Sequence, residues 1–241
     1  MNIDFCVPVY NEEEIFSVNA ERIWRFLQSF MCEYDWHLIF IVNGSNQKFI
    51  DLVQDFVNKH GPQSACFIIS ESGKGRAIKF YFDQSKADFL VYMDIDLAVD
   101  LLNLPQLLAP LLSDKADLCF GSRMLPASVK NRSWFREISS KVYLRLSRKL
   151  LGHRFTDLQC GFKAVSQEAW KSITPLILDK AWFFDTELIC LAQKKLLRLQ
   201  EIPVDWSENR YIKRRSKVKV WKEAWVFLFL TFKLRSRLQR M

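Results

Sequence analysis

Short apolar runs alternate along the chain with longer segments whose apolar residues recur at helical spacing. Runs of strand length, rich in apolar and β-branched residues, lie at 3–9, 36–42, 65–69, 88–93 and 116–120. Segments with helical spacing lie at about 12–30, 47–59, 75–84 and 103–113. Strands that alternate with helices of this length indicate βαβ units. The pattern therefore predicts an α/β fold with a mostly parallel sheet and helices on both of its faces.

The alternation changes after Gly121. The pattern then predicts an amphipathic helix at 133–151, a short strand in "CGFKAVS", a helix at 183–196 and a strand at 198–204. We expect this half of the chain, 124–206, to extend over the sheet and to bind the second of two substrates. No linker rich in Pro, Gly or Ser separates it from 1–123, so 1–206 is predicted to form one domain, followed by a tail at 207–241.

The basic excess of the chain is confined to this tail. Residues 207–241 contain eleven Lys or Arg against Glu208 and Glu223, whereas the rest of the chain carries 24 basic and 25 acidic residues. Such a tail is expected to contact an anionic surface, which could be acidic lipid, nucleic acid or a phosphorylated substrate.

The tail ends in a predicted amphipathic helix at about 218–238, with Trp221, Trp225, Leu228 and Phe232 on one stripe. Its apolar centre, "AWVFLFLTF", is shorter than the ~20 residues of a membrane span. Two interpretations stay open. The helix either packs in the core or against another subunit, or lies in a membrane interface with its basic flanks at the headgroups.

The six cysteines are scattered without a CxxC or CxxH pair, which argues against a structural zinc site. Most lie in apolar runs, where a free cysteine behaves as a small hydrophobic residue. The first residues, "MNIDFCVPVY", predict a strand and lack the pattern of a secretory signal. These features predict a reduced, cytoplasmic protein.

Polar residues follow each of the first five predicted strands, where parallel sheets bind ligands. The segments are "PVYNEEE", "NGSNQ", "ESGKGR", "DIDLAVD" and "GSR". Asp94 and Asp96 are separated by one residue, so in a regular strand both would point to the same face. Together they could bind Mg²⁺ or Mn²⁺, hard cations that prefer carboxylate oxygens and also bind phosphates. The alternative is an acidic pair that caps the next helix.

These segments resemble glycosyltransferase family 2 in their order and spacing, over about residues 3–220. The resemblance rests on "VPVYNEEE", "IVNGS", "GKGRAI", "MDIDL" and "GSR". Five more segments look like the branch that makes polyprenyl-phosphate sugars, the dolichyl-phosphate mannose and glucose synthase relatives. They are "FREISSKVY", "FTDLQCGFKAV", "WFFDTELICLA", "LQEIPVDW" and "RRSKVKV".

The resemblance implies a nucleotide-binding sheet of GT-A type, with a nucleotide diphosphosugar across its carboxyl edge. Pro8, Tyr10 and Glu12 match the motif that lines the nucleoside site, although Pro8 and Tyr10 would equally suit a rigid strand exit and a core aromatic. Family members usually carry two acids where this chain has Val42 and Asn43. An asparagine amide both donates and accepts hydrogen bonds, so the base, uracil or guanine, stays open.

The resemblance assigns Lys74 and Ile95 to the donor site as well. The "GKGR" segment is not a Walker A loop, and Lys74 could instead begin a helix as a solvated charge. Arg123 and Arg136 match family arginines near phosphates, whose oxygens suit a bidentate guanidinium, although Arg136 could form a surface salt bridge. The family often has a glutamine where this chain has Ala98. Coordination would then rest on the two aspartates, the diphosphate and water.

The nature of the acceptor decides whether a base is needed. A polyprenyl phosphate is already anionic, whereas a sugar hydroxyl needs a carboxylate to accept its proton. Asp157 is the first candidate for that base, followed by Asp185 and Glu187, and each could instead orient a helix or pair with Lys or Arg. Ser216 and Lys217 match a family loop that folds over the donor. They could bind the phosphate of the acceptor, or they could belong to a run of charged residues exposed to solvent.

The sequence thus predicts an inverting glycosyltransferase that uses Mg²⁺ or Mn²⁺ to move a hexose from a UDP- or GDP-hexose to a polyprenyl phosphate. We expect it at the inner face of a membrane, bound peripherally through its C-terminal helix, and compatible with a membrane-protein partner or a second copy. The alternatives are transfer to a sugar or lipid hydroxyl and a nucleotide-sugar-binding module that has lost catalysis. Nucleic-acid binding is disfavoured, because no stacking or groove-reading motif accompanies the basic tail.

Overall fold

The computed structural model describes the chain at 1–128, 130–131, 134–207 and 220–241, and side chains outside 129–141 and 208–224. Its strands are β1 (Asn2–Val9), β2 (Asp35–Asn43), β3 (Ser64–Ile69), β4 (Phe89–Met93), β5 (Leu118–Ser122), β6 (Lys130–Asn131), β7 (Phe162–Ser166), β8 (Leu199–Pro203) and β9 (Trp206–Ser207). Its α-helices are α1 (Phe16–Phe30), α2 (Gln47–His60), α3 (Lys74–Phe82), α4 (Leu104–Leu112), α5 (Trp134–Leu151), α6 (Gln167–Ile173), α7 (Phe184–Lys194) and α8 (Val220–Arg240).

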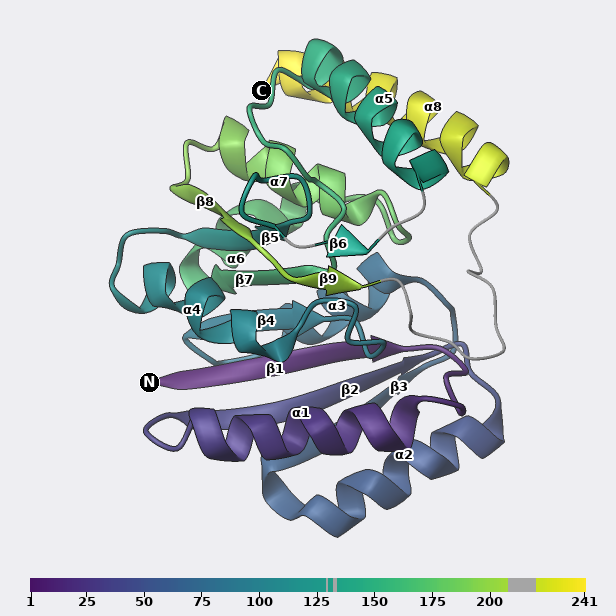
Figure 1. Cartoon of the computed structure of the whole chain (residues 1–241), viewed down its shortest axis with the longest axis vertical. Helices are drawn as coiled ribbons and strands as arrows, with labels where there is room; N and C mark the ends of the chain where they lie inside the picture. The colour runs from purple at the N-terminus through teal and green to yellow at the C-terminus, as the bar shows by residue number, and fades with distance from the viewer. Residues whose placement is uncertain (129, 132–133, 208–219) are drawn as a thin grey trace.

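Seven strands form one sheet in the order β3-β2-β1-β4-β7-β5-β8 (Figure 1). β7 runs antiparallel to both of its neighbours, β4 and β5, and the other pairs are parallel. The carboxyl ends of the parallel strands therefore meet at one edge of the sheet. Because β7 is reversed, the residues that lead into it lie at this same edge, beside the end of β4.

Helices cover both faces of the sheet, as the sequence predicts. α1, α2 and α4 share one apolar core with the sheet, and α3, α6 and α7 share the core on the opposite face. In the first core Phe16, Phe40 and Phe56 meet edge to face, with ring centroids 5.1 to 5.8 Å apart. α5 and α8 lie side by side beyond α7, farther from the sheet (Figure 1).

The predicted strands and helices are present with shifted ends, and one predicted helix start is wrong. α1 begins at Phe16 rather than at residue 12. Asn11 has a φ of +48°, and the Glu12 carbonyl accepts the N–H groups of Ile15 and Phe16, so these residues form a turn. α6 has no predicted counterpart, because its seven residues are too few to show a helical period.

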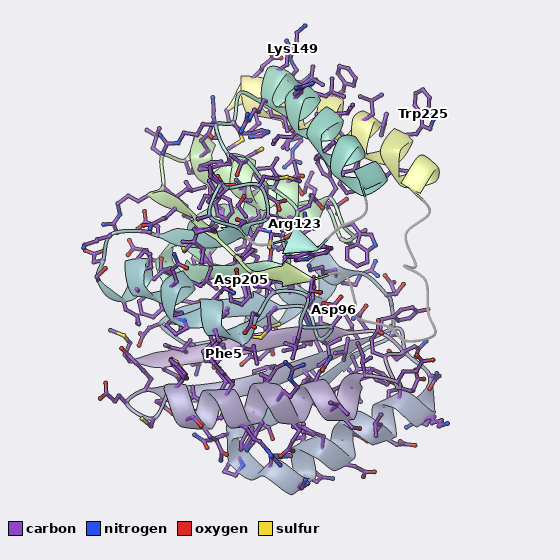
Figure 2. All side chains as sticks on the ribbon, viewed as in Figure 1. Phe5, Asp96, Arg123, Lys149, Asp205 and Trp225 are labelled. Carbon is purple, nitrogen blue, oxygen red and sulfur yellow. The ribbon has the colours of Figure 1, made fainter. Side chains whose placement is uncertain are left out.

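The apolar stripe predicted for the C-terminal helix faces outward. Trp225 is 73% exposed and Phe232 is 49% exposed, whereas Thr231 and Leu234 are buried on the opposite side of α8. Trp225 projects away from the body of the molecule (Figure 2). Within the described part of the chain, no helix combines the length and apolarity needed to cross a membrane.

Candidate active site

The acidic pair lies in a tight turn directly after β4. The Asp94 N–H donates to the Gly161 carbonyl at 3.2 Å, and its own carbonyl accepts the N–H of Leu97, which has a φ of +48°. An Asp96 carboxylate oxygen accepts the N–H of Ala98 at 3.0 Å. The turn, rather than a continued strand, therefore sets the directions of the two carboxylates. Asp96 and Arg123 both lie at the edge where β4 and β5 end (Figure 2).

Gly161 gives the Asp94 carboxylate its space. A Cβ atom at this position would lie 1.9 Å from Asp94 Oδ2 and 2.7 Å from Lys74 Nζ. No side chain can be accommodated at such distances without displacing the carboxylate or the ammonium. The reversed direction of β7 brings this glycine to the acidic pair, 67 positions along the chain from Asp94.

Lys74 is a buried partner of the acidic pair. It is the first residue of α3, and its Nζ lies 2.8 Å from Asp94 Oδ1 and 3.6 Å from Asp185 Oδ2. Burial lowers the pKa of Lys74, but the charges of Asp185 and Asp94 outweigh it and hold that pKa above its ordinary value. Lys74 does begin a helix, but the alternative that it is a solvated charge is excluded by its burial.

Asp185 compensates a second buried ammonium. Lys163 Nζ lies 2.6 Å from Asp185 Oδ1, and the Tyr92 hydroxyl donates to the same oxygen. Burial raises the pKa of Asp185, but Lys163 and Lys74 outweigh it, so that pKa lies below its ordinary value. Sequence reasoning missed Lys163 and Tyr92. Both lie inside strands, and the pattern of apolar and polar residues there does not distinguish them from other strand positions.

The acidic pair suits a cation that is also held by phosphates. The Asp94 side chain is 37% exposed, and both groups are carboxylates, the ligands that Mg²⁺ and Mn²⁺ prefer. Among the described residues there is no cluster of three or more His, Cys, Asp or Glu that could hold a metal alone. A cation at Asp94 and Asp96 would therefore take its remaining ligands from substrate and water, as Mg²⁺ commonly does.

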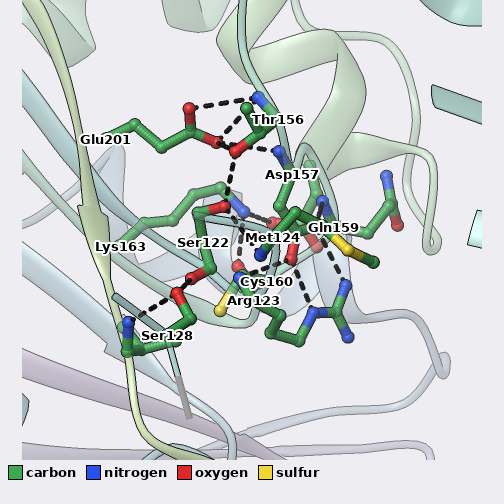
Figure 3. A network of polar contacts seen from close by, with 12 residues as sticks. Ser122, Arg123, Met124, Ser128, Thr156, Asp157, Gln159, Cys160, Lys163 and Glu201 are labelled. Atoms are coloured by element: carbon green, nitrogen blue, oxygen red, sulfur yellow. Dashed lines mark hydrogen bonds and ion pairs between the residues drawn. The ribbon is translucent and has the colours of Figure 1, made fainter. Parts of the chain in front are cut away.

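Arg123 and Asp157 form a bidentate ion pair beside the acidic turn (Figure 3). Arg123 Nε and Nη2 lie 2.6 and 2.9 Å from the two carboxylate oxygens, and the Arg123 backbone N–H donates to the same group at 3.1 Å. Burial raises the pKa of Asp157, but Arg123 outweighs it and holds that pKa below its ordinary value. Asp157 thus orients the predicted phosphate-binding arginine.

Glu201 of β8 fixes the turn that carries Asp157 (Figure 3). Its carboxylate accepts the backbone N–H groups of Thr156 and Asp157 at 2.8 Å and the Thr156 hydroxyl at 2.6 Å. Thr156 Oγ1 also lies 2.7 Å from Ser122 Oγ at the end of β5. Sequence reasoning missed Glu201 as a site residue, because a single sequence gives no sign that it contacts a turn 44 positions earlier.

The predicted nucleoside-site residues gather at the ends of β1 and β2. Pro8 lies within β1, Tyr10 follows it with 39% of its surface exposed, and Glu12 begins the turn before α1. Asn43 is buried, and its amide group joins two neighbouring segments. Its Nδ2 donates to the Val9 carbonyl at 2.8 Å, and its Oδ1 accepts the Gly73 N–H at 3.0 Å.

The remaining predicted residues lie in other settings. The Ile95 side chain is in the core beneath the acidic turn, and its carbonyl accepts the side-chain N–H of Asn19 at 3.0 Å. Glu187 is buried and paired with Arg237 of α8. Ser216 and Lys217 lie outside the described residues, and so does the side chain of Arg136.

The family model of glycosyl transferase family 2 matches residues 4–174. The chain therefore belongs to this family, and the predicted membership is confirmed. It is 30% identical over 206 residues to glycosyltransferase AglD of Haloferax volcanii, across 86% of this chain and 33% of that protein. It is 27% identical over 213 residues to dolichyl-phosphate beta-glucosyltransferase ALG5C of Trichomonas vaginalis, across 85% and 63%. The chain thus spans a third of the first relative and less than two thirds of the second.

The fold is also similar to that of glucosyl-3-phosphoglycerate synthase from Mycobacterium tuberculosis. The TM-score is 0.67 with 17% identity, over 97% of this chain and 78% of that one. That enzyme was crystallised with Mn²⁺, UDP and phosphoglyceric acid. A likeness at this identity establishes the fold, so the expected sheet of GT-A type is confirmed.

Proposed function

We propose that this protein is an inverting, metal-dependent glycosyltransferase that moves a hexose from a nucleotide diphosphosugar to a polyprenyl phosphate. The observation that carries the proposal is the pair Asp94 and Asp96 at the carboxyl end of β4, with the ammonium of Lys74 2.8 Å from Asp94. Family membership supports glycosyl transfer, and relatives named dolichyl-phosphate beta-glucosyltransferases support the acceptor.

In this proposal the donor lies along the carboxyl edge of the sheet, with residues 1–123 as its binding half and 124–206 as the acceptor half. The nucleoside would lie near Pro8, Tyr10 and Glu12, and the diphosphate near Asp94 and Asp96. Asp94 and Asp96 would hold a Mg²⁺ or Mn²⁺ ion, which would supply positive charge against the leaving group. Inversion follows from attack on the face of the sugar opposite that leaving group.

The chain's own residues prepare the charges around the donor. Lys74 holds one Asp94 oxygen, and the space over Gly161 accommodates the other. Arg123 holds its guanidinium at the same edge, because Asp157 accepts hydrogen bonds from Nε and Nη2 of this group and so fixes its orientation. Glu201 holds that aspartate's turn. These fixed charges can interact with phosphate without a rearrangement of the protein, which is the basis of electrostatic preorganisation.

The partners of the candidate bases favour an acceptor that is already anionic. The pKa values of Asp157 and Asp185 both lie below the ordinary range, held there by Arg123 and by two lysines respectively. A carboxylate with a lowered pKa is a weak proton acceptor. The Glu187 carboxylate is bound by Arg237 and by two backbone N–H groups. A phosphate oxygen needs none of these groups as a base, whereas a sugar hydroxyl does.

The proposal includes peripheral docking on the inner face of a membrane through an outer face of α5 and α8. The exposed apolar residues of these two helices form this face, and they are Val142, Leu146, Trp225, Val226, Phe229 and Phe232. Exposed basic side chains flank it, as Lys149 does on α5 (Figure 2). Apolar residues flanked by Lys and Arg fit the interface of an anionic bilayer, where a lipid acceptor would lie.

Transfer of radiolabel tests the proposed reaction. Wild-type protein and Asp96→Ala are incubated with labelled UDP- and GDP-hexoses, Mn²⁺ and a short polyprenyl phosphate. We expect metal-dependent label in the lipid phase for the wild type and its loss in the variant. Donor hydrolysis without a lipid product would move the acceptor to a hydroxyl. Donor binding without any turnover would refute the enzyme and favour the binding module.

Vesicle sedimentation tests the docking surface. Trp225→Ser combined with Phe229→Ser is expected to weaken binding to vesicles of phosphatidylserine and phosphatidylcholine by about 10-fold or more, since each change removes large apolar area from the interface. Leu102→Ser is the matched control, because Leu102 is an exposed apolar residue beside α4. Docking would be contradicted if the double variant bound vesicles as well as Leu102→Ser does. A wild-type protein that forms a dimer and does not bind vesicles would also contradict docking and would favour an oligomer contact.

A further inference from the structure

The first turn of α7 joins three separate parts of the molecule. It contains three consecutive buried polar residues, Asp185, Thr186 and Glu187. Asp185 contacts the two lysines beneath the acidic turn. Thr186 Oγ1 lies 2.9 Å from the Tyr143 hydroxyl of α5 and accepts from Gln159 Nε2 at 2.7 Å. Glu187 is bound to α8, so one helical turn contacts the donor side, the acceptor side and the outer helices.

Glu187 fixes the loop that precedes its own helix. Its Oε2 accepts the N–H groups of Leu178 and Asp179 at 2.9 and 2.7 Å. The remaining oxygen, Oε1, accepts from Arg237 of α8, whose guanidinium also donates to the Leu176 carbonyl. A buried carboxylate needs such a cation, because removal of one member of a buried ion pair leaves an uncompensated charge.

The same loop, 177–183, supports the start of α3. Its Ala181 and Lys180 carbonyls accept the N–H groups of Gly75 and Arg76 at 3.2 and 3.0 Å. The contact is close, since a Cβ atom on Gly73 would lie 2.3 Å from the Lys180 carbonyl oxygen. Lys74 lies between these glycines, and its ammonium holds Asp94. A movement of the 177–183 loop would therefore move the lysine that orients the candidate cation site.

We infer that Arg237 is a positioning residue through which the C-terminal helix sets the affinity of the donor site. The contacts run from Arg237 to Glu187, from Glu187 to the 177–183 loop, and from that loop to Lys74 and Asp94. A different side of α8 carries the proposed docking face, so a shift of this helix on its support would alter the donor site. The inference rests on the proposed function for the identity of the ligand, and the mechanical coupling is measurable without it.

Hydrogen exchange tests the coupling in the intact chain. In Arg237→Ala we expect the amides of Leu178, Asp179, Gly75 and Arg76 to exchange at least about 10-fold faster, while β1 amides keep their wild-type rates. The matched control is Arg235→Ala, an exposed arginine on the same helix, which should leave all these rates unchanged. Arg237→Lys keeps a charge beside Glu187, and its rates should lie between those of the wild type and Arg237→Ala.

Two results would overturn the inference. Faster exchange at Leu178 and Asp179 without any change at Gly75 and Arg76 would mean that the coupling stops at the loop. Equal acceleration of every amide, β1 included, would mean that Arg237 contributes only to global stability. If Arg237→Ala does not fold, the same two criteria apply to Arg237→Lys.

A binding measurement connects the coupling to the ligand. Calorimetry with UDP or GDP and Mn²⁺ should give a Kd about 5- to 10-fold higher in Arg237→Ala than in Arg235→Ala. An unchanged Kd would overturn the inferred control of donor affinity. A wild type that binds neither nucleotide would refute the donor assignment of the proposed function, and the exchange rates would still decide the coupling.

Discussion

Lys74 Nζ and Asp94 Oδ1 lie 2.8 Å apart, although one residue begins α3 and the other follows β4. The ammonium and a divalent cation would therefore share one carboxylate. Two cations bound to one carboxylate repel each other, and the repulsion is larger in a partly buried site than in water. In the proposed site the lysine would thus limit how tightly the metal alone binds, while its charge would remain available to a diphosphate.

Replacement of this lysine tests the shared carboxylate. We expect Lys74→Met to bind Mn²⁺ alone about 10-fold more tightly, because a repulsion of about 1.4 kcal/mol is removed. Asp185 keeps Lys163 and Tyr92 as partners in this variant. Manganese binding can be followed by electron paramagnetic resonance. Lys79→Met is the control on the same helix, and weaker or equal Mn²⁺ binding in Lys74→Met would contradict the prediction.

A methyl group at Gly161 should displace Asp94. The added Cβ of Gly161→Ala would lie 1.9 Å from Asp94 Oδ2, so we expect Mn²⁺-dependent nucleotide binding to weaken at least about 10-fold and stability to fall by about 1–3 kcal/mol. Gly152→Ala is the control. Gly152 has a φ of +70° and open space around it, so the change should cost about 1 kcal/mol without affecting binding. Normal nucleotide affinity in Gly161→Ala would refute this role of Gly161.

The Arg123–Asp157 pair should show strong coupling in a double-mutant cycle. Either Arg123→Gln or Asp157→Asn leaves one buried charge without its partner, so each is expected to lower the free energy of unfolding by about 3–5 kcal/mol. The double variant should lose less than the sum of the two single changes, because it leaves no unpaired charge. Urea unfolding provides the four free energies. Strict additivity would show that the ion pair does not hold the turn.

His153 should make stability depend on pH in mildly acidic solution. Its imidazole is buried, with Nε2 2.9 Å from Ser147 Oγ, and burial together with nearby Arg148 lowers its pKa from 6.5 to about 4. Between these values the unfolded chain binds a proton that the folded chain does not. This contribution to stability is therefore complete above pH 6.5 and is lost, by about 1.4 kcal/mol per pH unit, as the pH falls toward 4.

Comparison with His153→Gln isolates this effect, because the glutamine cannot titrate and its amide can still contact Ser147. Urea unfolding from about pH 7 to pH 4 should give a curve for the variant that falls by about 3 kcal/mol less than that of the wild type. Parallel curves for the two proteins would mean that His153 titrates alike in the folded and unfolded states.

The strands and most helices were predictable because their signals are local. The apolar runs of β1 and β2 follow directly from a sheet buried on both faces, and the positions of α2 and α7 follow from helical spacing. The reversal of β7 was not predictable, since the direction in which a strand pairs depends on neighbours distant in sequence. The spacing of apolar residues in α8 predicted a stripe along the helix. Whether that stripe faces solvent or the core depends on how α8 packs against α5 and α7.

The features of the candidate site also divide into those predictable from local sequence and those set by tertiary contacts. The sequence by itself determined the family, the order of most strands and helices along the chain, and the acidic pair after β4, because these depend on residue types at short spacing. Only the tertiary structure decided that Lys74 is buried against Asp94, that Gly161 makes room for this carboxylate, and that Glu201 supports Asp157. Each of these contacts joins residues from separate elements, and its energy arises from burial and charge compensation that exist only in the folded chain.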